Sequence, residues 1–90
     1  MSKPARIVFS PRFERIFRAL AKKKPSLMPP LLTGLDKIER EPELGKPMRD
    51  PLSGKRRIHI FGSFVLLYEI AGNEIRLLDF DHHDKIYKKR

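Results

Sequence analysis

The stretch DFDHHDKIYKKR, residues 79–90, carries side chains well suited to chemistry. His82 and His83 stand between carboxylates, and a tyrosine and a run of cations follow. A second set, Arg57 and His59, occupies alternate positions of RRIHI and therefore faces one side of a predicted strand. Histidine titrates near neutral pH and can act as a general acid or base, while arginine stabilises developing negative charge.

These residue types suit RNA cleavage, in which the 2′-OH of the substrate attacks the adjacent phosphate and the protein supplies proton transfer and cations. Tyr87 can stack on a base or donate a hydrogen bond. Histidine and aspartate are also metal ligands, but neighbouring side chains on a strand point to opposite faces. We therefore expect His82 and His83 to diverge and predict no metal site. The serines show no partner motif for nucleophilic catalysis.

The net charge of +9 comes from 20 Lys and Arg against 11 Asp and Glu. Residues 1–24 sum to +7 and residues 55–90 to +3, whereas residues 25–54 sum to −1. Such a chain attracts polyanions, nucleic acid first. The alternative, a Lys- and Arg-rich archaeal or thermophilic surface that binds nothing, stays open.

Composition excludes several other classes. The chain has no cysteine, which excludes disulfides, thiolate nucleophiles and sulfur-based zinc sites. No apolar run approaches the roughly 20 residues of a membrane span, and no hydrophobic signal segment stands at the start. We therefore expect a cytoplasmic protein with no membrane partner, folded as a single domain over residues 1–90.

The elements that must position these groups can be identified from periodicity. Residues 5–10 form a predicted strand, and a helix follows with Ser10 as its N-cap and Pro11 at its first position. A second helix is predicted over SLMPPLLTGLDKIERE, with Ser26 as a candidate cap, and residues 41–54 form a predicted loop.

From Lys55 onward the sequence alternates with a period of two. RRIHI, SFVLLYEI and EIRLLDF predict three antiparallel strands, the last two joined by a tight turn at AGNE. The predicted class is α+β, in the order β-α-α-β-β-β. Two N-terminal helices pack on one face of a small, mainly antiparallel, twisted sheet. The other face would carry Arg57 and His59 openly.

The element order, the basic charge and the segments PLSGKRRIHI, GSFVLLYEI and HHDKIYK resemble the RelE/ParE toxin superfamily of toxin–antitoxin systems. RelE-like members cleave messenger RNA in the ribosomal A site without a metal, by the 2′-OH route. ParE-like members inhibit DNA gyrase instead. The resemblance implies a type II toxin that inhibits translation as a ribosome-dependent messenger-RNA endoribonuclease. It also implies a cognate antitoxin, ribosome and messenger RNA as partners, and no cofactor.

Carried over by position, the basic residues Lys55, Arg56 and Arg57 match the start of the basic strand of the family. His82 matches the histidine of the closing segment, and Tyr87 matches the tyrosine that stacks on a base. The predicted catalytic residues are Arg57, His59, His82 and Tyr87. The predicted RNA-binding residues are Lys55, Arg56, Arg76, His83, Lys85 and Lys88.

Two positions depart from the family pattern. Val65 stands where the arginine of the central strand would be, and His83 replaces the arginine of the closing segment. Arg76 or the Arg56–Arg57 pair can substitute only if the fold brings them close. The alternative is a non-cleaving protein of the same fold that binds nucleic acid or a gyrase-type target.

Overall fold

The computed structural model describes residues 6–88, and for residues 87 and 88 it describes the backbone alone. The elements are β1 (Arg6–Phe9), α1 (Pro11–Lys23), α2 (Met28–Arg40), β2 (Lys46–Pro47), β3 (Arg56–Ile60), β4 (Phe64–Ala71), β5 (Glu74–His82) and α3 (His83–Lys88). Single-turn 3-10 helices at Pro25–Leu27 and Pro42–Leu44 precede α2 and β2. Each predicted element is present, and β2 and α3 are additions that were not predicted from the sequence.

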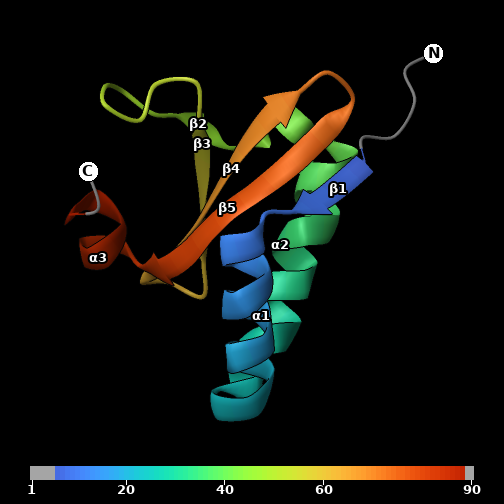
Figure 1. Cartoon of the computed structure of the whole chain (residues 1–90), viewed down its shortest axis with the longest axis vertical. Coiled ribbons are helices and arrows are strands. Elements are labelled where there is room, and N and C mark those ends of the chain that lie inside the picture. Colours follow the sequence, from blue (N-terminus) through green and yellow to red (C-terminus); the bar gives the residue numbers. More distant parts are fainter. Residues whose placement is uncertain (1–5, 89–90) are drawn as a thin grey trace.

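The strands form one sheet in the order β1-β5-β4-β3-β2. β1 runs parallel to β5, whereas the pairs β5–β4, β4–β3 and β3–β2 are antiparallel. Figure 1 shows α1 and α2 together on one side of the strands and α3 on the other. The predicted α+β class, with two helices on one face of a mainly antiparallel sheet, is confirmed.

The start of α1 follows the predicted capping. The Ser10 hydroxyl accepts a hydrogen bond from the Phe13 N–H at 3.1 Å, and Pro11 occupies the first turn, where its missing donor costs nothing. Lys22 and Lys23 lie in the last turn, where cations complement the helix dipole.

The prediction that Ser26 caps α2 is wrong. Ser26 lies within the 3-10 turn, and Leu27 precedes the helix without a side-chain capping bond. The prolines of the first turn lessen the need for a cap because they have no N–H to satisfy. Further along α2, a methyl group on Gly34 would overlap Cδ1 of Ile60, so glycine permits this close approach to β3.

Both faces of the sheet bury apolar side chains. The main core lies between the sheet and the two N-terminal helices, and includes Phe13, Leu31, Ile38, Leu66, Tyr68, Ile75, Leu77 and Phe80. Val65 and Leu67 alternate with Leu66 and Tyr68 along β4 and so face the other side, where they are also buried. Ile86 of α3 is buried as well, and α3 contacts β4 and β5. A second, smaller apolar layer therefore underlies the face opposite the N-terminal helices.

Tyr68 holds the segment between α2 and β3 in place. Its hydroxyl donates to the Pro42 carbonyl at 2.7 Å and accepts from the Gly45 N–H at 2.8 Å. The Arg56 guanidinium donates to the Gly45 carbonyl at 2.8 Å. Burial raises the pKa of Tyr68 above its usual 10.0, while the Gly45 hydrogen bond and the Arg56 charge lower it in part. We name these contacts the Tyr68 clamp.

A β-bulge changes which side chains of β5 face the helices. Leu67 lies opposite Asp79, but Tyr68 lies opposite Leu77, so one residue of β5 is left without a partner. Strict alternation from Leu77 would turn Asp79 toward the core. The extra residue instead turns Phe80 to the helix side and leaves Asp79 on the opposite face.

Candidate functional site

Strand β3 positions the first pair of predicted site residues. Arg57 lies opposite Leu67 and His59 opposite Val65, so both share the face that points away from the main core. The prediction that Arg57 and His59 share this face is therefore confirmed. The His59 residue is exposed and Arg57 is partly buried.

A groove of about 720 Å³ runs beside these residues, between β3 and α2. Its lining residues are Pro30, Thr33, Gly34, Lys37, Leu44, Lys46, Arg57, Ile58, His59, Ile60 and Phe61. The lining contains three cations and no carboxylate. We name it the β3 groove. It is large enough for several ligand groups, and its charge favours an anion.

The groove follows a strand edge that is only partly covered. β2 pairs with Arg56 and Arg57, and the Met48 N–H donates to the Lys55 carbonyl at 2.9 Å. In an antiparallel strand the outward backbone groups recur at every second residue. Those of Lys55 and Arg57 point to β2, so the next outward set, at His59, lies beyond the end of β2.

The centre of this face is apolar rather than cationic. Val65 lies between His59 and Asp81 in one cross-strand row, and Leu67 lies between Arg57 and Asp79 in the next. Val65 is fully buried. The position where the resemblance implies an arginine is thus part of the buried apolar layer on this face, and a cation there would have to leave that layer.

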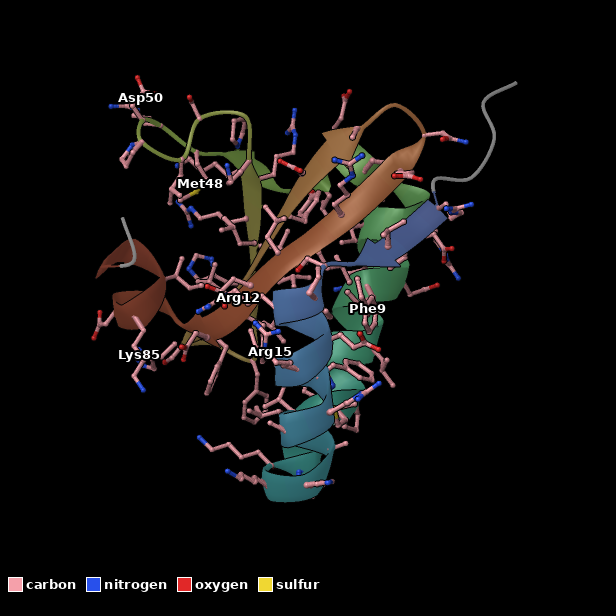
Figure 2. The ribbon with its side chains drawn as sticks, viewed as in Figure 1. Phe9, Arg12, Arg15, Met48, Asp50 and Lys85 are labelled. Carbon is pink, nitrogen blue, oxygen red and sulfur yellow. The ribbon has the colours of Figure 1, made fainter. Side chains whose placement is uncertain are left out.

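Asp79 is the buried charged residue of this region. Arg12, at the start of α1, lies with its Nε 3.4 Å from Asp79 Oδ2. Figure 2 shows Arg12 on the first turn of α1, beside β5. Helix α1 therefore supplies a cation to β5. No pattern in the sequence predicted this contact between α1 and β5.

The prediction that His82 and His83 point to opposite faces is wrong. β5 ends at His82 and α3 begins at His83, so the alternation of a strand does not apply between them. Their rings stack with centroids 4.7 Å apart and an interplanar angle of 26°. His82 also packs edge-on against Phe64, at 5.9 Å.

His82 lies on the helix side of the sheet. It pairs with Phe64, whose ring stacks on Phe80 of the main core at 5.5 Å. Arg57 and His59 lie on the other face, so the structure does not bring the ring of His82 beside them. The junction is fixed by a hydrogen bond from the His83 N–H to the Ser63 carbonyl at 2.9 Å.

The predicted RNA-binding cations are scattered. Arg56 donates to the backbone of the Tyr68 clamp rather than facing the groove. Arg76 forms ion pairs with Glu69 at 3.8 Å and Glu74 at 3.5 Å, in the half of β5 remote from α3. Neither arginine therefore substitutes for the cation that Val65 replaces.

The other predicted positions lie at the ends of elements. Lys55 is partly buried just before β3, and Lys85 is exposed on α3, as Figure 2 shows. Tyr87 and Lys88 belong to α3 by their backbone, but their side chains lie outside the described part of the structure. The structure therefore brings Arg57 and His59 together, and His82 with His83, as two separate pairs.

Lys37 and Lys46 supply cations to the β3 groove and were not predicted from the sequence. The four α2 residues of the lining, from Pro30 to Lys37, recur at i, i+3, i+4 and i+7. This spacing marks one side of a helix and was available in the sequence. Lys46 carried no such signal because its place depends on the pairing of β2 with β3.

Two further kinds of feature bear on function in the described residues, namely helices able to span a membrane and groups of metal-ligating side chains. None of their helices has the length and apolar character needed to cross a bilayer. Within residues 6–86, one group combines three metal-competent side chains, namely His82, His83 and Asp84.

Comparison with known proteins places this geometry in a family. The family described as the ParE toxin of the type II toxin–antitoxin system matches residues 7–87. A relative named for the toxin RelE4, from Methanocaldococcus jannaschii, is 35% identical over 86 residues, which cover 93% of this chain and 92% of that protein.

Solved structures agree with the match. The toxin–antitoxin complex RelBE2 from Mycobacterium tuberculosis contains a chain with a TM-score of 0.72 and 27% identity, covering 89% of this chain and 99% of that one. The YoeB dimer from Staphylococcus aureus gives a TM-score of 0.77 at 20% identity, covering 90% and 99%, and supports the fold alone. The chain therefore belongs to the RelE/ParE superfamily of toxins of type II toxin–antitoxin systems.

Proposed function

We propose that this toxin is a ribosome-dependent messenger-RNA endoribonuclease that inhibits translation. Its partners are then the ribosome and messenger RNA in the cytoplasm, and a cognate antitoxin that holds it inactive. The antitoxin follows from the family and from the similarity to RelBE2, a complex of a toxin with its antitoxin. The reaction is attack of the ribose 2′-OH on the adjacent phosphate, without a cofactor. The bond between the phosphorus and the 5′ oxygen of the next nucleotide breaks, so that the products are a 2′,3′-cyclic phosphate and a 5′-hydroxyl, which takes its proton from water.

The observation that carries the proposal is an exposed histidine on strand β3, at the border of a groove that is flanked by cations. His59 lines the β3 groove with Lys37, Lys46 and Arg57. An imidazole is the kind of group that can take the proton of the 2′-OH. The three cations would hold the phosphate and stabilise the negative charge of the pentavalent intermediate. We assign His59 as the general base and Arg57 as the main charge-stabilising residue.

The C-terminal residues have different roles in this proposal. His83, Lys85 and Lys88 belong to α3, which lies on the side of the sheet away from α1 and α2, and would contact RNA at a distance from the reacting phosphate. Tyr87 would stack on a base. His82 lies on the helix side, so we assign it to positioning His83 through the ring stack.

A second function is favoured by Val65. This residue is fully buried where RNA-cleaving relatives are expected to carry an arginine, and Asp79 and Asp81 flank the same face. Loss of one preorganised charge-stabilising group commonly costs about 10²-fold or more in rate. A chain without it can retain the groove as a binding surface for nucleic acid or a gyrase-type target without cleaving RNA.

An in vitro translation assay separates the two functions. Messenger-RNA ends would be mapped by primer extension with the wild-type chain, His59→Ala and Arg57→Ala, each with and without a chelator. Arg18→Ala is the matched control, because Arg18 is an exposed cation whose ion pair with Glu14 lies on α1. Codon-internal cuts that survive the chelator and Arg18→Ala, but disappear in the other variants, support the nuclease. Uncut message that stays uncut at high protein concentration supports the binding protein.

A further inference from the structure

We propose that His82, His83 and Asp84 form a binding site for a divalent transition-metal ion of the zinc class. The proposal goes beyond the nuclease function, which needs no metal. One ligand atom from each residue lies within 4.8 Å of the others. The site exists because β5 turns into α3 between the two histidines, which places consecutive side chains on one side of the chain.

Both imidazoles lie close to the carboxylate of Asp84. His83 Nδ1 lies 3.1 Å from Asp84 Oδ1, and His82 Nδ1 lies 3.8 Å from Asp84 Oδ2. In a tetrahedral zinc site with ligand distances near 2.0–2.1 Å, neighbouring ligand atoms are roughly 3.3 Å apart. The observed separations at Asp84 are close to this value, so small side-chain rotations are enough to converge on one ion.

The local electrostatics favour a cation between these groups. The Asp84 N–H donates to His82 Nδ1 at 3.3 Å, so this nitrogen carries a lone pair, and a metal ion bound to Nδ1 would replace this long hydrogen bond. The ion-pair partners of Asp84 are the two histidines rather than a lysine or arginine of the described residues. A metal ion satisfies the lone pairs of both imidazoles and the carboxylate at once.

The site is also held open to solvent. The side chains of His82, His83 and Asp84 are 40%, 43% and 64% exposed, so an ion can enter and a water molecule can complete its coordination. The Phe64 ring and the His83–Ser63 backbone bond restrict the junction. Because these contacts already hold the two histidines in place, metal binding needs to order fewer side chains.

Isothermal titration calorimetry of Zn²⁺ into the full chain, without RNA, tests the site. We expect one ion per chain, and a roughly tenfold or greater loss of affinity in His83→Ala and in the isosteric variant Asp84→Asn. His59→Ala is the matched control, because it removes the histidine of the β3 groove and should leave affinity unchanged. Circular dichroism would verify that each variant is folded.

Co²⁺ gives a second readout, since its visible absorption reports a low-coordinate nitrogen–oxygen ligand set. Absence of Zn²⁺ binding, or equal affinity in all variants, would overturn the proposal. Because no RNA is present, neither result bears on cleavage. An inactive nuclease that still binds Zn²⁺ would refute the proposed function and leave the metal site standing.

Discussion

The Tyr68 clamp allows a prediction whose magnitude can be worked from the structure. Replacing Tyr68 with phenylalanine keeps the ring in the core and removes one hydroxyl. That hydroxyl makes two short hydrogen bonds, to the Pro42 carbonyl and from the Gly45 N–H. Both backbone groups then lose their partner beside a ring that is fully buried.

An unsatisfied buried polar group costs about 1–3 kcal/mol, whereas a neutral hydrogen bond contributes about 0.5–1.5 kcal/mol net. Gly45 is buried, so bulk water does not readily reach its N–H once the hydroxyl is removed. We therefore expect Tyr68→Phe to lower the free energy of unfolding by about 2–3 kcal/mol. For a domain of this size that corresponds to roughly 8–24 °C in Tm.

Urea denaturation followed by circular dichroism measures this change, with Arg18→Ala as a surface control that should stay within about 0.5 kcal/mol. The clamp also holds Leu44 and Lys46 at the β3 groove, so the variant should bind RNA more weakly even where it remains folded. A loss below about 0.5 kcal/mol would refute the view that these two bonds fix the segment between α2 and β3.

Four further outcomes follow from the same contacts. Because the pKa of Tyr68 is raised in the folded state, its contribution to stability is complete below pH 10 and is lost as the pH rises through the folded value. Thermal melts above pH 10 should show this loss in the wild type and not in Tyr68→Phe. Gly34→Ala should lower the free energy of unfolding, measured in urea, by about 1–3 kcal/mol, because the added methyl group overlaps Ile60. This loss outweighs the better helix propensity of alanine. An additional Ile60→Val change should recover part of the loss. Val65→Arg should lower Tm sharply, because Val65 is fully buried and the larger, charged side chain does not fit the apolar layer. A folded, more active variant would contradict the burial argument. Arg12→Ala should cost about 1 kcal/mol by leaving Asp79 without this cation, as urea melts would show.

Much of the fold was predictable because its local signals agree with its packing. Ser10 and Pro11 start α1 as expected, and the period of two from Lys55 onward predicted the three strands of the meander. The shared face of Arg57 and His59 followed from strand alternation alone. These predictions depend on neighbours in sequence, where backbone geometry determines the outcome.

Two features that decide which side chains meet could not be predicted from the sequence. The bulge between Leu67 and Tyr68 decides which side chains of β5 face the core, and neither strand reveals it alone. The change from strand to helix at His83 reversed the expectation that the two histidines diverge. A shift of one residue in either feature would exchange the faces of the site.

The β3 groove was also predictable only in part from the sequence. The stripe on α2 that ends at Lys37 was present in the sequence, but its value depended on which strand it faced. β2 has two residues and no periodicity, so Lys46 could be placed only by its pairing with Arg57. The cationic lining is therefore a property of the assembled sheet and helix rather than of any one segment.

The product ends of cleavage test the central claim most directly. A messenger RNA programmed in the ribosomal A site would be incubated with the full chain and the cut ends analysed by mass spectrometry. A second message would carry a 2′-deoxy nucleotide at the cut position. We predict a 2′,3′-cyclic phosphate from the first message and no cleavage of the second. Cleavage of the deoxy message, or no cleavage of either, would contradict the proposed reaction.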